Sequence, residues 1–245
     1  MKTHKQVEFF FVFRYTIPMP TNSGREFIKS QTRSKKRVTD HGEVFTAERE
    51  VNAMLDLVKQ ETERIDSRFL EPACGTGNFL AEILRRKLAV VKSRYGKNPD
   101  DYERYAVIAV TSIYGVDLLQ DNVDECRNRM FEIFDKEYTA ICAMWADDET
   151  RMAVHHILKH NILCGDALTL KTSAGQPIAF AEWSAVNSCL LKRRDFRLDQ
   201  MLEGREQQYT LDMVDWSYDE EVKAYIPLPF REFPPVHYRM VQQYE

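Results

Sequence analysis

The sequence lacks the features that mark membrane-spanning, secreted and disulfide-bonded proteins. Its most apolar N-terminal run, 9–13, has five residues, whereas a membrane-spanning helix needs about 20. This run also lacks the small-residue cleavage site of a signal peptide. The five cysteines are an odd number and contain no CxxC pair, which favours reduced thiols over a zinc or disulfide framework. We therefore expect a cytoplasmic protein with no membrane partner and no metal site.

A strong excess of one charge is also absent. The chain has 34 basic and 38 acidic residues, a formal net charge of −4, which argues against tight, non-specific nucleic-acid binding through overall charge. A local basic face remains compatible with DNA. In 245 residues, a hydrophobic fraction of 44% supports one large α/β domain, or one domain with appendages.

Short apolar runs alternate with segments of helical periodicity along the chain. This alternation predicts an α/β fold with a doubly wound, mostly parallel sheet. The expected strands are 68–71, 113–117, 161–166 and 177–183. The expected helices begin at residue 48, where Thr46 is the candidate N-cap, and cover 78–92, 102–112, a segment after 117, 139–160 and 191–202.

The most informative stretch is FLEPACGTG, residues 69–77. An apolar run ends in Glu71, and a turn containing Gly75 and Gly77 leads into an amphipathic helix, which is the nucleotide-binding unit of α/β folds. It is not a GxGxxG motif, because Leu80 stands three residues after Gly77. It is not a P-loop either, since no Lys-Ser or Lys-Thr pair follows. An unrelated glycine turn is the alternative interpretation.

The stretch EPACGTGNFL, residues 71–80, resembles motif I of S-adenosylmethionine-dependent DNA amino-methyltransferases from restriction–modification systems, D/E-P-A-C-G-S/T-G-x-F/L. The resemblance implies a Rossmann-like class I methyltransferase fold and S-adenosyl-L-methionine as cofactor. A small residue fits at Cys74, and a catalytic thiol there is the less favoured interpretation. The cofactor-binding residues implied by motif I are Glu71, Pro72, Ala73, Cys74, Gly75, Gly77, Asn78 and Phe79.

Three further segments follow in the order of the same family. Residues 41–50, HGEVFTAERE, resemble motif X, which packs around the methionine end of the cofactor; Phe45 and Thr46 match, and Ala47 stands where proline is usual. Residues 113–123 resemble motif II, and residues 162–168 resemble motif III. This resemblance implies that Asp117, next to Leu118, binds the ribose hydroxyls and that Asp166, next to Ala167, contacts the adenine ring.

The catalytic motif of the family, D/N/S-P-P-Y/F/W, is missing. The region where it belongs reads IAFAEWSAVNS, residues 178–188, and the only Pro-Pro pair is Pro234–Pro235 in an unrelated context. Glu182 and Trp183 are the candidates for a divergent catalytic pair, with Glu182 orienting the target amine. An ordinary strand end with a packed tryptophan is the alternative.

The last part of the sequence shows no further strand–helix unit. We expect an N-terminal extension (1–37), a methyltransferase-like domain (38–190), and a C-terminal helix with an irregular tail (191–245), and leave open a sheet truncated after its fourth strand. A basic face on the expected helix is the candidate DNA contact, and a solvated face is the alternative. Its residues are Lys192, Arg193, Arg194 and Arg197.

Together these features favour an S-adenosylmethionine-dependent DNA adenine-N6 methyltransferase of a restriction–modification or mobile-element system, with DNA as partner. A second subunit could supply recognition or catalytic elements. The alternative is a catalytically silent module that binds the cofactor or a partner. Methylation of RNA or protein is less favoured, because the residue pattern of motif I is typical of the DNA enzymes.

Overall fold

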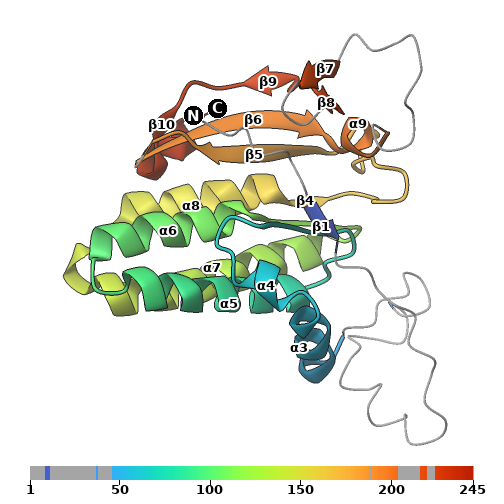
Figure 1. Ribbon diagram of the computed structural model, residues 1–245. Helices are drawn as coiled ribbons and strands as arrows, with labels where there is room; N and C mark the ends of the chain where they lie inside the picture. Colours follow the sequence, from blue (N-terminus) through green and yellow to red (C-terminus); the bar gives the residue numbers. More distant parts are fainter. Residues whose placement is uncertain are drawn as a thin grey trace, which may run out of the picture.

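A computed structural model describes residues 9–11, 37, 46–187, 189–203, 216–219 and 224–244. The chain is of mixed α/β class, as expected, and contains a parallel sheet with the strand order β1-β2-β3-β4 (Figure 1). The strands are β1 (Phe9–Phe11), β2 (Arg68–Glu71), β3 (Ile113–Asp117) and β4 (Ile162–Cys164). The expected bounds of β2 and β3 are confirmed to the residue, whereas the pairing of β1 with β2 was not anticipated.

The β2–β3 and β3–β4 crossovers each contain a long helix that runs back and a shorter helix that runs forward. In Figure 1, α5 and α7 lie side by side in one layer, and α6 and α8 form the next. The shorter helices pass almost directly into the strands, because a single residue separates α6 from β3 and none separates α8 from β4. The helices are α5 (Asn78–Tyr95), α6 (Pro99–Thr111), α7 (Gln120–Cys142) and α8 (Asp148–Asn161), with the 3-10 turn η1 (Ala143–Trp145) before α8.

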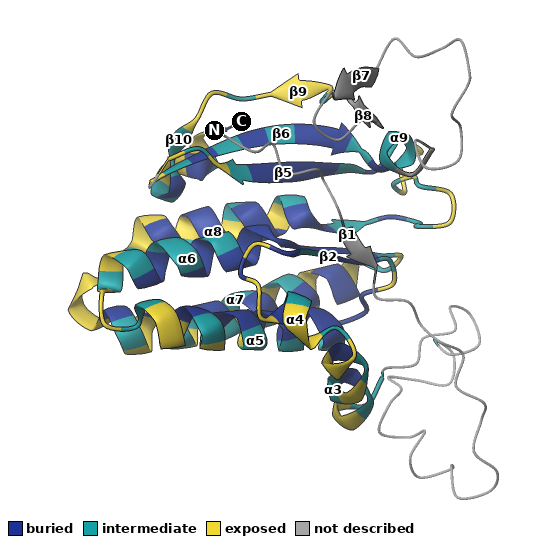
Figure 2. Cartoon of the chain, viewed as in Figure 1, coloured by how far each residue is buried: buried dark blue, intermediate teal, exposed yellow. Residues whose placement is uncertain are grey.

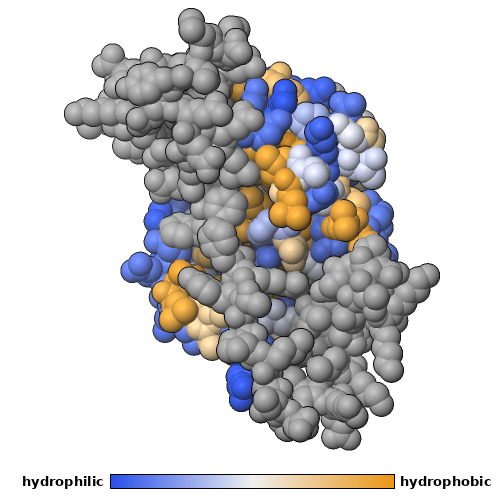
Figure 3. Space-filling model, turned by 90° about the vertical axis from the view of Figure 1, so that its right-hand side faces the viewer, coloured by the Kyte–Doolittle hydropathy of each residue, from blue (hydrophilic) through white to orange (hydrophobic). Residues whose placement is uncertain are grey.

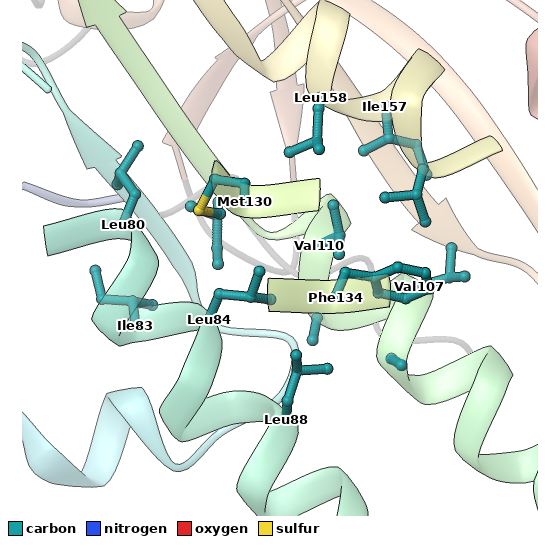
Figure 4. Packing of buried hydrophobic residues seen from close by; sticks show 14 of the residues in the cluster. Leu80, Ile83, Leu84, Leu88, Val107, Val110, Met130, Phe134, Ile157 and Leu158 are labelled. Atoms are coloured by element: carbon teal, nitrogen blue, oxygen red, sulfur yellow. The ribbon is translucent and has the colours of Figure 1, made fainter. Parts of the chain in front are cut away.

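Apolar side chains from all four helices meet in one core (Figure 4). Burying one large aliphatic or aromatic side chain stabilises a fold by about 1.5–3 kcal/mol, so this core is the main support of the strands. The labelled residues are Leu80, Ile83, Leu84 and Leu88 of α5, Val107 and Val110 of α6, Met130 and Phe134 of α7, and Ile157 and Leu158 of α8.

Helix starts follow local capping chemistry. The Asn98 side chain accepts from the Asp100 amide, and Pro99 occupies the first turn of α6, where its missing N–H costs nothing. Asp147 caps α8 in the same way through the Glu149 amide. Helix α3 (Glu48–Asp56) begins where expected, but its N-cap is Ala47, which makes no side-chain cap. The prediction that Thr46 caps this helix is therefore wrong.

Asn161 joins the two places where a helix becomes a strand. Its Nδ2 donates to the carbonyls of Thr111 and Ile113, at 3.2 and 3.1 Å. Its Oδ1 accepts from Trp183 Nε1 at 2.9 Å. Carbonyls at the end of a helix need such partners when they are buried, so the completely buried Asn161 secures the helix–strand junctions against each other.

A second, antiparallel sheet covers the helix layer formed by α6 and α8 (Figure 1). It contains β5 (Ala179–Ala185), β6 (Leu190–Arg197), β9 (Arg231–Glu232) and β10 (Val236–His237). The expected fourth strand therefore exists as β5, but it pairs antiparallel with β6 and does not extend the parallel sheet. The strands β7 (Trp216–Asp219) and β8 (Ala224–Pro227) pair antiparallel in a separate two-stranded sheet.

The expected helix at 191–202 is wrong: the chain forms β6 and then a short helix, α9 (Leu198–Glu203). Buried and half-buried positions alternate along the first part of β6, which is the period of a strand. Two of the buried positions carry Arg193 and Asp195, which bind each other. The charged residues at inward positions concealed the strand pattern.

Different elements pack on the two faces of the parallel sheet. Helices α5 and α7 contact one face. On the other, Leu70, Tyr114 and Val116 pack against Ile178 and Phe180, at the start of β5. Within the described part of the chain an antiparallel strand thus takes the place that a helix has in a doubly wound sheet.

The C-terminal residues belong to the core and are not an irregular tail. The 3-10 segment η3 (Tyr238–Gln243) packs on α8, and its Val241 is completely buried. Figure 2 shows buried residues along β5 and β6 as well. The expected boundary at residue 190 would divide the β5–β6 hairpin. Among the residues described here, no helix has the length and apolar character needed to cross a membrane.

Candidate cofactor site

The three acidic residues at strand ends lie along one edge of the parallel sheet. Glu71 ends β2, Asp117 ends β3, and Asp166 follows β4 by two residues. The Gly165 amide donates to the Asp117 carbonyl at 2.9 Å, which brings the third acid beside the second. The carboxyl ends of parallel strands are where α/β folds bind ligands. Figure 3 shows this side of the molecule, with hydrophobic and hydrophilic side chains intermixed beside atoms drawn in grey.

The glycine turn after β2 is held against β3 by backbone hydrogen bonds. The Cys74 amide donates to the Val116 carbonyl at 2.9 Å, and the Gly77 amide donates to the Cys74 carbonyl at 2.8 Å. Gly75 and Gly77 have φ angles of 54° and 82°, in the left-handed region that favours glycine. The turn therefore has one fixed shape at the edge of the sheet.

Asp117 connects this turn to the start of α7. One carboxylate oxygen accepts from the Gly75 amide at 2.9 Å. The other accepts from the Leu119 amide at 3.0 Å and from Asn122 Nδ2 at 3.1 Å. A carboxylate offers roughly four acceptor positions and Asp117 is partly exposed, so it can accept a further hydrogen bond from a ligand hydroxyl.

Asn122 is a site residue that the sequence reasoning missed. It is almost completely buried and directs its amide at the Asp117 carboxylate. An asparagine in the first turn of a helix that follows an acidic strand end is the signal that could have identified it, because short polar side chains bind local backbone and carboxylate groups there.

The remaining motif I residues differ in what they can offer a ligand. Ala73 is exposed and Pro72 half-buried, whereas the Glu71 carboxyl is almost completely buried. Phe79 packs in the hydrophobic core. A hydrogen bond with the Cys126 thiol and burial both raise the pKa of Cys74 well above its ordinary value, so this thiol stays protonated and is a poor nucleophile.

The segment that resembles motif X reaches the glycine turn. Asn78 Nδ2 donates to the Thr46 carbonyl at 2.9 Å, so Thr46 lies at the start of α5. Phe45, its predicted neighbour in the site, lies outside the described residues.

Asp166 lies in a polar loop beyond β4. It accepts from the Leu168 amide at 2.8 Å, and this backbone hydrogen bond is the main reason why the pKa of Asp166 lies below its ordinary value. Ala167 is half-buried, while Leu118 and Leu168 are exposed at 56% and 95%. Two exposed leucines beside the acids give the edge an apolar component.

Glu182 and Trp183 do not join this edge. Glu182 is buried and forms an ion pair with Arg68, the first residue of β2, whereas the site lies at the other end of that strand. A second arginine, Arg194, donates to Glu182 Oε2 at 3.0 Å. Trp183 is buried and donates to Asn161. The structure therefore separates the proposed catalytic pair from Asp117 by the length of β2.

The four candidate DNA-binding residues do not form a helical basic face. They lie on or at the end of β6, where successive side chains point to opposite faces. Each is paired with a carboxylate: Lys192 with Glu232, Arg193 with Asp195, Arg194 with Glu182 and Arg197 with Asp199. Their charges are therefore largely compensated within the chain.

The edge combines hydrogen-bond acceptors with a fixed glycine turn. Carboxylates accept hydrogen bonds from hydroxyl and amine donors, and three of them repel a phosphate group. A fixed glycine turn allows a ligand to approach the backbone closely.

Comparison of the chain with models of protein families, with curated proteins and with solved structures gives no match.

Proposed function

We propose that this chain binds S-adenosyl-L-methionine at the carboxyl edge of the parallel sheet and is a DNA adenine-N6 methyltransferase of restriction–modification or mobile-element type. The observation that carries the proposal is the contact between Asp117 and the Gly75 amide. It places the acid of the motif II-like segment directly at the turn of the motif I-like segment.

Strand order supports a nucleotide-binding sheet. In doubly wound sheets, the third, second and first strands lie side by side, and the ligand binds where the order reverses next to the first. Here β4, β3 and β2 follow that order, and β1 lies on the other side of β2. The ligand would then extend across the ends of β2 and β3.

The acidic edge supports this cofactor over other nucleotides. S-adenosylmethionine carries a sulfonium and an ammonium group and no phosphate. In the proposed complex Asp117 accepts hydrogen bonds from the ribose hydroxyls, Asp166 contacts the adenine ring, and the glycine turn lies against the methionine portion. Hydrogen bonds to a carboxylate are charge-assisted and therefore strong.

The cofactor would supply a methyl group for the exocyclic amine of an extruded adenine. The chain would then contribute mainly the position and orientation of the two reactants. The position of Glu182, at the opposite end of β2 and bound to two arginines, favours a second candidate function. In that case the chain is a catalytically silent cofactor-binding module, or a subunit whose partner supplies the catalytic loop.

Calorimetric titration with S-adenosylmethionine tests cofactor binding. We expect the wild-type chain to bind, and Asp117→Ala to bind at least about tenfold more weakly, because charge-assisted hydrogen bonds are lost. Asp148→Ala, a matched change at an exposed aspartate on α8, should bind like wild type. Thermal unfolding of each variant separates lost contacts from a lost fold.

Two outcomes of this titration would contradict the proposal: no binding by a folded wild-type chain, or unchanged affinity in Asp117→Ala. Methyl incorporation from labelled cofactor into adenine-containing DNA then separates the two candidate functions. Transfer by the chain alone supports the methyltransferase. Binding without transfer supports the silent module or a missing partner.

A further inference from the structure

Asn78 connects two segments that are far apart in the sequence. It is the first residue of α5, and its Nδ2 donates to the Thr46 carbonyl at 2.9 Å. Its Oδ1 accepts from Arg129 Nη1 at 2.6 Å. A carbonyl partner on one side and a guanidinium on the other allow only one orientation of the amide. Both polar atoms of the Asn78 side chain, Nδ2 and Oδ1, therefore have a partner within the chain.

Arg129 extends from α7 toward the same turn. Besides Asn78, its guanidinium donates to the Thr76 carbonyl at 3.5 Å, a long contact. The side chain is half-buried, and burial lowers its pKa below the ordinary value. A desolvated guanidinium gains more from its hydrogen bonds than an exposed one, so Arg129 fixes Asn78 firmly.

Helix α3 holds the other side of the Thr46 segment. Val51 and Leu55 of α3 are buried in the core. Arg86 of α5 donates to Asn52 Oδ1 at 2.9 Å and pairs with Asp56 at 2.9 Å. Thr46 therefore lies between a docked helix on one side and the Asn78 contact on the other.

We propose that Asn78 and Arg129 are positioning residues that hold the Thr46 segment against the glycine turn and thereby set the affinity for the amino-acid end of the cofactor. The inference rests on the proposed function. Asn78 stands at the one position of the motif I-like pattern that accepts any residue, and Arg129 lies outside every motif-like segment. Their contacts give the positioning role, and the resemblance of residues 41–50 to motif X implies the amino-acid end of the cofactor as the part affected.

A matched pair of ligands tests this role. S-adenosylhomocysteine and methylthioadenosine are both neutral thioethers with the same nucleoside, and only the first carries an amino-acid group. We expect Asn78→Asp and Arg129→Met to bind S-adenosylhomocysteine about tenfold more weakly, because each change removes a hydrogen bond that holds Thr46 against the glycine turn. Their affinity for methylthioadenosine should stay within about twofold of wild type.

Asn78→Asp is the sharper variant. Its carboxylate keeps the contact with Arg129 but places an acceptor against the Thr46 carbonyl, so only the link to Thr46 is broken. Arg129→Lys retains one donor and should recover most of the affinity for S-adenosylhomocysteine. Arg85→Met removes an arginine of α5 that pairs with Glu82 and should leave both affinities unchanged.

The outcomes separate this inference from the proposed function. If the wild type binds both ligands and the two variants weaken both equally, the residues only shape the turn and the inference is overturned. Unchanged affinities, or equal wild-type affinity for the two ligands, overturn it as well while the cofactor site stands. A folded wild-type chain that binds neither ligand removes the proposed function and the inference with it.

Discussion

Gly77 has no room for a side chain. A Cβ at this position would lie 2.6 Å from Cys126 Sγ, and its φ of 82° already favours glycine. Gly175 has nearly the same φ, 76°, but nothing lies within 4 Å of a Cβ there. The two glycines thus separate the backbone cost of a left-handed residue from the cost of overpacking.

We expect Gly77→Ala to lower the free energy of unfolding by about 3 kcal/mol or more, since a left-handed alanine costs about 1–2 kcal/mol and a core clash adds about 1–3 kcal/mol. Gly175→Ala should lower the free energy of unfolding only by the cost of a left-handed alanine, about 1–2 kcal/mol. Chemical denaturation measures both. In a Cys126→Ala background, Gly77→Ala should become less costly; an unchanged cost there would rule out the contact with Cys126 Sγ.

At the scale of elements, Lys87 ties helix α5 to the beginnings of two strands. Its completely buried ammonium donates to the carbonyls of Ile65 and Ser67 and to Ser112 Oγ. Ser67 precedes β2 and Ser112 precedes β3. Burial lowers the pKa of Lys87 from an ordinary value of 10.5 to about 7.

This pKa predicts a dependence of stability on pH. Between about pH 7 and 10.5 the unfolded chain binds a proton at Lys87 that the folded chain does not, so stability rises with pH in this window. Relative to Lys87→Met, the wild type should gain at most about 1.4 kcal/mol per pH unit between pH 7 and 9.5. Denaturation at several pH values measures this difference. Lys59→Met, at an exposed lysine, controls for the loss of a surface charge. A Lys87 difference that does not change with pH would refute the depressed pKa.

For the whole molecule, Glu103 joins the C-terminal segment to three helices. Its buried carboxylate accepts from Tyr138 at 2.6 Å, Thr150 at 2.9 Å, Tyr238 at 2.7 Å and Arg239 at 2.5 Å. Burial raises the pKa of Glu103, but the hydrogen bonds from Arg239 and the hydroxyls outweigh it and hold this pKa below its ordinary value.

We expect Glu103→Gln to lower the free energy of unfolding by about 3 kcal/mol, because it removes the buried negative charge that accepts from Tyr138, Tyr238 and the half-buried Arg239. Glu63→Gln, at an exposed ion pair with Lys59, should change it by less than about 1 kcal/mol. The Glu103 contribution is present above about pH 4.5 and is lost as pH falls through its lowered pKa. A variant as stable as wild type at pH 7 would contradict this assignment.

The sequence was sufficient where local signals agreed. The strands at 68–71 and 113–117 end in acids beside turns, and the structure places Glu71, Asp117 and Asp166 at one edge. It was insufficient where distant pairing decided the fold. Nothing local indicates that Phe9–Phe11 pairs with β2, or that Arg193 and Asp195 neutralise each other inside a strand. Cofactor binding itself stays a prediction.

Residue roles that depend on distant partners were equally hidden. Asn122 and Arg129 are polar residues on a helix, a pattern that usually marks a solvated face. Only the fold shows that one binds Asp117 and the other Asn78. Glu182 was considered for catalysis because of its neighbours in sequence, whereas its partner in space is Arg68.

The direct passage of α6 into β3 and of α8 into β4 has a consequence for protein engineering. A guest domain or a circular-permutation site requires a surface turn whose backbone is not needed elsewhere. No such turn exists at residues 111–113 or 161–162, where buried backbone carbonyls are held by Asn161. The exposed residue Lys97, between α5 and α6, offers one far from the glycine turn. A fluorescent reporter inserted there would lie at the opposite end of α5 from the carboxyl edge of the parallel sheet and should leave that edge unaltered.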